Sequence, residues 1–138
     1  MNKISVGIMI FLISFFGAAY CLEAQNPERL SDICAGTCSA SPNIFVEFNG
    51  KLYFNASNGV SGYELWVYDG INPPTMVADI YPGSSGSNPS YFKIFQDKLY
   101  FQATENTHGS ELWIYDGSNP PTIVADIGPV SIPLLQRI

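Results

Sequence analysis

The residues that could carry chemistry are few and widely spaced. The chain has a single histidine, His108, and two carboxylate pairs at equal spacing, Glu64 with Asp69 and Glu111 with Asp116. Such a pair could cleave a glycosidic bond if its carboxyl groups lay ~5–10 Å apart across a sugar. Both pairs recur identically, however, and the sequence lacks a nucleophile elbow, a zinc-protease motif and a phosphate-binding loop. We predict no catalytic residue, with Asp69 and Asp116 accepting backbone hydrogen bonds in turns. A polysaccharide hydrolase is the alternative.

Metal binding has a weaker basis in the sequence. Asp32, Asp79 and Asp126 recur beside glycine-rich loops, where carboxylate and carbonyl oxygens could bind Ca²⁺. The spacing of an EF-hand is absent, so stabilisation of turns is the expected role of these side chains. We therefore predict no cofactor and no metal site.

Two cysteines, Cys34 and Cys38, lie outside the N-terminal apolar segment, with three residues between them. In an exported chain such an even pair predicts a disulfide. Two free thiols in a loop are the alternative. A zinc site would need about four ligands, and the sequence around this pair does not supply them.

Composition excludes some classes of function. The 138 residues include 12 acidic and 6 basic side chains, which gives a net charge of −6. Binding to nucleic acid needs clustered Lys and Arg to neutralise phosphates, so we expect no nucleic-acid partner. With 46% hydrophobic and 14% aromatic residues, the chain is predicted to fold, and its length fits one domain.

The N-terminus has the pattern of a secretory signal peptide. Lys3 precedes an apolar run, Ile4–Phe16, which small residues follow. We predict cleavage after Ala24, or alternatively after Ala19, and a secreted or cell-surface protein. An uncleaved membrane anchor is the other interpretation, because Ile4–Leu22 is just long enough to span a bilayer.

An internal repeat dominates the rest of the chain. Residues 44–84 align without a gap with residues 91–131, at an offset of 47 positions, and more than half of the aligned residues are identical. The repeated positions that we expect to be structural are Glu64, Leu65, Trp66, Asp69, Gly70 and Asp79, with Glu111, Leu112, Trp113, Asp116, Gly117 and Asp126 in the second copy. A period of 47 lies between those of two common kinds of propeller blade, ~40–45 and ~50 residues.

Each repeat is predicted to form four short strands. In the first repeat they are Ile44–Phe48, Lys51–Ala56, Tyr63–Tyr68 and Thr75–Ile80, with apolar residues alternating along them and turn residues between them. Asn49-Gly50 predicts a two-residue hairpin turn. The expected fold is all-β: two four-stranded antiparallel blade-like repeats, a partial β-propeller.

The predicted domain layout follows the repeat. Residues 1–24 form the signal segment, and residues 25–43 hold a strand, Glu28–Ile33, and a loop that match the end of a repeat. Residues 44–90 are the first repeat. Residues 91–138 are the second repeat and the start of a degenerate third.

The string Glu-Leu-Trp-x-Tyr-Asp-Gly, followed by Asp-Ile-x-Pro-Gly, resembles the ELWxxDGT repeat family of large secreted bacterial proteins, sometimes labelled hyalin-like. The resemblance covers residues 28–130. The sequence departs from the family pattern at Ile71 and Ser118, which stand in place of Thr, and at Val130, which stands in place of Gly. The resemblance implies a β-propeller-like array on an exported protein, and it supplies no enzymatic site.

These observations predict a noncatalytic module for surface display, adhesion or binding of a protein or carbohydrate ligand. The loops Ser57–Gly62 and Glu105–Gly109 differ between repeats, and variable loops on a constant scaffold are where recognition is expected. The repeated Trp66 and Trp113 are expected in the core, with an exposed sugar-binding platform as the alternative.

Two blades leave open sheet faces, because a propeller closes with ~4–8. Three explanations remain open: a fragment of a longer repeat protein, which we favour; several copies that complete a ring as a homo-oligomer; or two sheets packed as a small sandwich. A nonfunctional truncated product is a further alternative.

Overall fold

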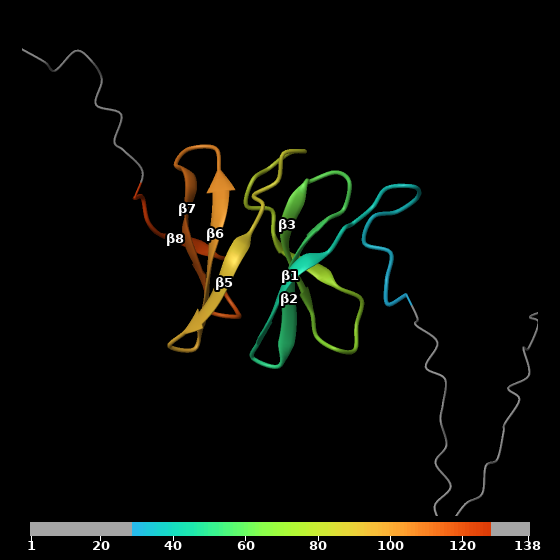
Figure 1. The fold of residues 1–138 in the computed structure, drawn as a ribbon, viewed down its shortest axis with the longest axis horizontal. Coiled ribbons are helices and arrows are strands. Elements are labelled where there is room, and N and C mark those ends of the chain that lie inside the picture. Colours follow the sequence, from blue (N-terminus) through green and yellow to red (C-terminus); the bar gives the residue numbers. More distant parts are fainter. Residues whose placement is uncertain (1–28, 128–138) are drawn as a thin grey trace, which may run out of the picture.

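The computed structural model describes residues 29–127, and this part of the chain is all-β (Figure 1). The predicted signal segment, both predicted cleavage sites and the start of the degenerate third repeat from residue 128 onward lie outside the described residues. The strands of residues 29–127 are β1 (Asn43–Phe48), β2 (Lys51–Ser57), β3 (Tyr63–Tyr68), β4 (Thr75–Ala78), β5 (Ser90–Phe95), β6 (Lys98–Glu105), β7 (Gly109–Tyr115) and β8 (Thr122–Ala125). They form two antiparallel sheets, β1-β2-β3-β4 and β5-β6-β7-β8, which confirms the two predicted four-stranded repeats.

The two repeats have the same register even where their turn residues differ. Asn49 and Gly50 connect β1 to β2 with φ values of 50° and 69°. Gln96 and Asp97 make the equivalent turn between β5 and β6, with φ values of 47° and 53°. Positive φ at both central residues is the geometry of a type I′ hairpin turn, whose twist matches that of the flanking strands. Only the first of these turns has a sequence typical of that geometry.

One predicted strand is wrong. The described part of Glu28–Ile33 has no strand conformation. The equivalent residues of the first repeat lie in and after β4, and β4 pairs with β3 of its own repeat. Residues 29–33 join neither of the two sheets. Ile33 still packs in the core, against the first sheet.

The predicted end of the fourth strand also needs correction. β4 ends at Ala78, two residues before the predicted Ile80. The amide of Ile80 donates a hydrogen bond to the Glu64 carboxylate instead of extending the ladder with β3. β8 ends in the same way, because the amide of Ile127 donates to Glu111. The repeated glutamate thus diverts the backbone from the sheet.

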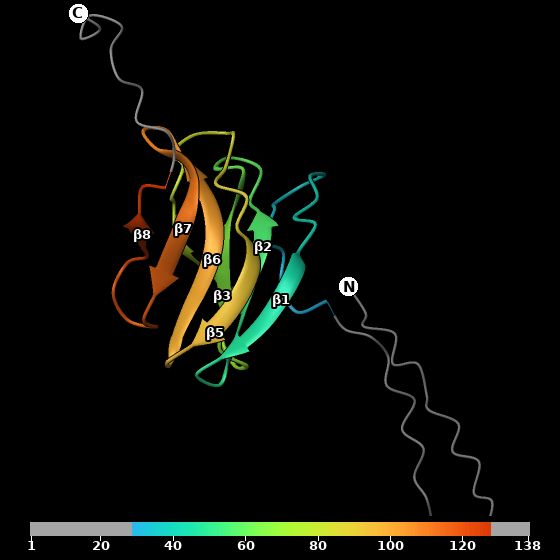
Figure 2. The same ribbon diagram turned by 60° about the vertical axis from the view of Figure 1, so that its left-hand side comes forward.

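The two sheets stack face to face and in the same orientation (Figure 2). We call the side of each sheet that carries Leu52 and Phe54, or Leu99 and Phe101, its front face, and the opposite side its back face. The back face of the first sheet packs on the front face of the second. The buried cluster between them consists of Phe48, Tyr53, Leu65, Leu99, Phe101, Ala103, Trp113 and Tyr115.

Tyr53 lies at the centre of this interface. Its ring meets that of Tyr115 edge-on, with 5.7 Å between centroids. Burial raises the pKa of Tyr53 to about 12, and the nearby Tyr115 adds to the rise. The Tyr53 hydroxyl is therefore neutral at physiological pH, as an apolar interface requires.

A second, smaller cluster covers the front face of the first sheet. Phe54, Ala56 and Trp66 are buried there, and Ile33 of the N-terminal segment packs against them. Trp113 has the equivalent place between the sheets, and both indoles are at most 9% exposed. The prediction that the repeated tryptophans lie in the core is confirmed, so neither indole forms an exposed platform.

Candidate functional site

Several loops lie along one edge of the stack (Figure 1). We call it the loop edge, and it consists of the residues 34–38, 57–62, 81–89 and 105–109. Three backbone hydrogen bonds connect these loops to residues directly beside the other loops. Ser57 donates to Ala40, at 3.0 Å, and Thr104 donates to Ser87, at 2.9 Å. Asn88 also donates to Tyr63, at 2.9 Å. Both loops that the sequence predicts for recognition lie on this edge.

Glu64 connects β3 to the 81–89 loop. Its carboxylate is fully buried and accepts hydrogen bonds from the amides of Ile80 (3.1 Å), Tyr81 (3.2 Å) and Ser87 (2.8 Å), and from the Ser87 hydroxyl (2.6 Å). Burial raises the pKa of Glu64, while these four donors oppose the rise. With its oxygens occupied by three backbone amides and the Ser87 hydroxyl, this carboxylate holds a loop and is not exposed to solvent.

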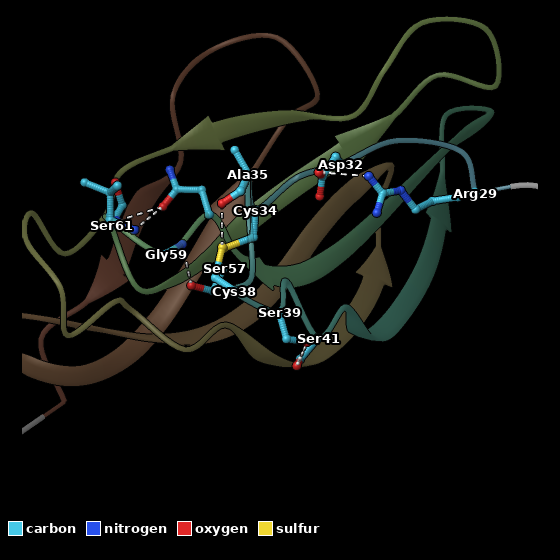
Figure 3. The surroundings of a disulfide bond; sticks show 12 residues. Arg29, Asp32, Cys34, Ala35, Cys38, Ser39, Ser41, Ser57, Gly59 and Ser61 are labelled. Atoms are coloured by element: carbon cyan, nitrogen blue, oxygen red, sulfur yellow. Dashed lines mark hydrogen bonds and ion pairs between the residues drawn. A yellow bond between two sulfur atoms is a disulfide. The ribbon is translucent and has the colours of Figure 1, made fainter.

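The 57–62 loop packs against the disulfide. Cys34 and Cys38 are bonded to each other, with their Cα atoms 5.7 Å apart, as predicted (Figure 3). A Cβ built on Gly59 would lie 2.8 Å from the Cys34 sulfur, and Gly59 has φ of +81°. Only glycine fits both the space and the backbone conformation at this contact.

Side-chain hydrogen bonds stiffen the same loop. Asn58 Oδ1 accepts from the amides of Val60 and Ser61, at 2.9 and 2.8 Å. Val60 is therefore held on the surface, 74% exposed, at the tip of the loop. An apolar side chain presented in this way by a rigid loop is available to a ligand.

The 105–109 loop has the same construction from different residues. The Glu105 carboxylate accepts from the amides of Thr107 (2.9 Å) and His108 (2.6 Å), and it also contacts the His108 ring. The Thr107 amide makes the largest contribution to a lowered pKa of Glu105. Glu105 thus has the loop-holding role of its counterpart Asn58. The loop exposes Thr107 and the His108 imidazole where the first loop has Val60 and Ser61. No local motif predicts that Glu105 organises the loop.

The repeated aspartates stabilise turns on the opposite edge of the stack. Asp69 Oδ1 accepts from the amides of Ile71 and Asn72, and its other oxygen accepts from the Asn72 side chain. Asp116 accepts from the amides of Ser118 and Asn119 and from the Asn119 side chain in the same way. The predicted turn role of both aspartates is confirmed. These hydrogen bonds, led by that of the asparagine side chain, lower the pKa of each aspartate to about 2.

The proposed glycosidase pairs are not brought together. Glu64 lies near the start of β3 and Asp69 follows its end, so about 16 Å of strand separates them at ~3.3 Å per residue. Glu111 and Asp116 are separated in the same way along β7. Two carboxylates at opposite ends of a strand cannot flank one glycosidic bond, which needs ~5–10 Å.

The remaining predicted residues lie in structural positions. Gly70 and Gly117 have positive φ in the turns after β3 and β7. Leu65 is buried between the sheets, whereas Leu112 is partly exposed on the back face of the second sheet. Asp79 and Asp126 lie on the surface after β4 and β8, and Asp32 forms an ion pair with Arg29 at 2.8 Å. Within residues 29–127, no three His, Cys, Asp or Glu side chains are grouped to hold a metal ion.

Comparisons of the chain with protein-family models, with curated proteins and with solved structures find no match. The ELWxxDGT resemblance therefore stands on the repeated residues alone. A search for membrane-spanning helices in the described part of the chain finds none of sufficient length and hydrophobicity. The candidate site accordingly rests on the geometry of the loop edge.

Proposed function

We propose that this chain is an exported, noncatalytic repeat module of β-propeller type that binds a protein or carbohydrate ligand through its loop edge. Surface display or adhesion is the role that suits such a module. The proposal depends on one observation. Two loops of different sequence, 57–62 and 105–109, occupy the same position on two nearly identical sheets, and each is held by its own internal hydrogen bonds.

Rigid loops favour binding because less conformational entropy is lost when a ligand docks. The neighbouring 81–89 loop and the disulfide hold the two recognition loops on one edge. This surface offers an apolar tip at Val60 and, on the other loop, the exposed His108 imidazole held beside Glu105. A ligand that bridges both loops would meet an apolar contact at one loop and polar contacts at the other.

The competing hydrolase function has less support from the geometry. Its best candidates, Glu64 and Glu111, are buried and accept hydrogen bonds from backbone amides. A general acid or nucleophile must reach the substrate, and neither carboxylate is exposed to do so.

A loop exchange tests the proposal. Asn58, Val60 and Ser61 are replaced by the Glu, Thr and His of positions 105, 107 and 108. The reverse exchange is made separately. Gly59, the loop length and the following glycine are kept. Each variant is tested against an array of polysaccharides and extracellular proteins. We expect ligands of the wild-type chain to be lost or changed in both exchanges. The matched control, I71S with S118I, exchanges repeat residues on the opposite edge and should bind as the wild type does. Binding that survives both loop exchanges, or turnover of an array polysaccharide, would contradict the proposal.

A further inference from the structure

The exposed back face of the second sheet repeats most of the apolar residues of a face that is buried elsewhere in the chain, with Lys93 in the place of Val46. Phe48 and Leu65 on the back of the first sheet are 3% and 0% exposed. Their repeat counterparts on the back of the second sheet, Phe95 and Leu112, are 59% and 37% exposed. Phe95 already packs on Tyr100, at 6.1 Å between ring centroids, much as Phe48 packs on its own tyrosine at 5.8 Å. The apolar side chains of this face are therefore already arranged as in the buried junction, but no segment within residues 29–127 packs over them.

A groove marks the uncovered face. Its volume is about 500 Å³. It is lined by Tyr91, Gln102, Ser110, Glu111, Leu112 and Ile127. In the first sheet the counterpart of Leu112 is Leu65, which the second sheet buries completely.

The complementary face lies at the other end of the stack. Leu52 on the front of the first sheet is 36% exposed, whereas its counterpart Leu99, covered by the first sheet, is 0% exposed. Phe45, beside it, is 57% exposed, while its counterpart Phe92 is half-buried. An apolar pocket of about 250 Å³ lies between this face and the N-terminal segment, with Ile33 in its lining.

An isoleucine recurs at the repeat spacing, and its burial differs with whether a sheet face lies against it. Ile33 packs on the front of the first sheet, and Ile80 packs on the cluster between the two sheets. Ile127 is 71% exposed. It therefore has the position of Ile80 without a front face to pack against in the described part of the chain.

We propose that the back face of the second sheet docks onto the front face of the first sheet of a second copy of this chain. The contact would repeat the junction that already joins the two sheets, with Phe95 and Leu112 in the places of Phe48 and Leu65. Ile127 of one copy would take the place that Ile33 of the next copy occupies, so the N-terminal segment moves aside on docking. This inference does not depend on the binding function proposed above.

The docking is head-to-tail, because the two faces are different surfaces of the chain. Such an interface closes into a ring when its rotation permits, or otherwise continues as a filament. A ring of ~4–8 blades would contain about two to four copies, since each chain supplies two.

The test uses the full chain, expressed from Met1 and purified in the form that the cell produces. We expect light scattering to give about two to four times the mass of one chain. F95D disables only the back face and L52D only the front face, so each variant alone should be monomeric. Mixed together, the two variants retain one intact junction and should form a heterodimer that does not grow further. I71D, which changes an 87% exposed turn residue outside both faces, should leave the assembly intact.

A larger assembly that F95D and L52D each abolish would be the filament form of the same contact. Three outcomes overturn the proposal. A folded wild-type monomer at high micromolar concentration would mean that these faces do not bind a second copy, as expected if a further repeat of a longer protein covers them. Oligomers that persist in F95D or L52D would place the interface elsewhere. A mixture that stays monomeric would exclude head-to-tail pairing. Circular dichroism on each variant is the control for folding. If the β structure is retained, a lower mass in light scattering means loss of assembly and not unfolding.

Discussion

Replacing Glu64 by Gln tests whether this buried carboxylate holds the 81–89 loop. Glu64 Oε2 accepts from the Ile80 amide and the Ser87 hydroxyl, and Oε1 accepts from the amides of Tyr81 and Ser87. Glutamine keeps one oxygen and places an NH₂ group at the other position. The best arrangement puts that NH₂ toward the Ser87 hydroxyl, which can rotate to accept, and leaves the Ile80 amide without an acceptor.

The expected cost follows from this geometry. One hydrogen bond to a charged group contributes ~1.5–3 kcal/mol, and a neutral amide recovers part of the cost of burying a carboxylate. We therefore expect E64Q to lower the free energy of unfolding by about 2 kcal/mol. E64A, which leaves all four donors without an acceptor, should cost about 4 kcal/mol. For a domain of this size, about 2 kcal/mol corresponds to a fall in Tm of roughly 10 °C.

Chemical and thermal unfolding, followed by circular dichroism, give these values. E47Q is the matched control, because Glu47 is exposed on β1, and it should change stability by less than ~0.5 kcal/mol. The reasoning is refuted if E64Q unfolds as the wild type does. A fully stable E64Q that has lost a polysaccharide-cleaving activity would instead favour the hydrolase.

Three further predictions concern turns, pH and the disulfide. D97G should stabilise the chain by about 1 kcal/mol in denaturant unfolding, because Asp97 has φ of 53° and glycine relieves that strain; a loss of stability would contradict the turn geometry. The pKa of Asp69 and of Asp116 is lowered to about 2, so their stabilising effect is complete above the ordinary value of 3.8 and is lost as pH falls toward 2. D69N with D116N should therefore flatten stability against pH in this window, and an unchanged slope would exclude the aspartates as its cause. Reduction of the Cys34–Cys38 bond should lower the free energy of unfolding by about 2 kcal/mol, from the entropy of a five-residue loop. C34S with C38S should not respond to reductant, and an equal response would assign the effect elsewhere.

The strands could be predicted because local signals and the repeat agreed. Alternating apolar residues and the Asn49-Gly50 turn define β1 and β2 without tertiary information. The turn at Gln96 and Asp97 has no such signal, yet the gapless repeat places β5 and β6 correctly because the second copy reuses the register of the first.

The interactions between distant residues could not be predicted. Ser87 lies 23 residues after Glu64, and nothing in either local sequence indicates that they bond. The strand expected at Glu28–Ile33 failed for a similar reason. A strand needs a partner, and the repeat pattern shows which residues are equivalent without showing what pairs with them.

The loop edge was found only in outline. Sequence variation between the repeats identified the 57–62 and 105–109 loops, but the contact of Gly59 with the disulfide emerged only from the structure. The role of Glu105 in ordering its loop also needed coordinates, since an acidic loop residue has many possible partners.

Mapping a bound ligand by NMR tests directly whether the loop edge is the binding surface. A ligand from the array is titrated into ¹⁵N-labelled chain, and the amide shifts are followed residue by residue. We expect the largest changes in residues 57–62, 81–89 and 105–109, along the loop edge. Changes concentrated instead around Asp69 and Asp116, on the opposite edge, would contradict this expectation.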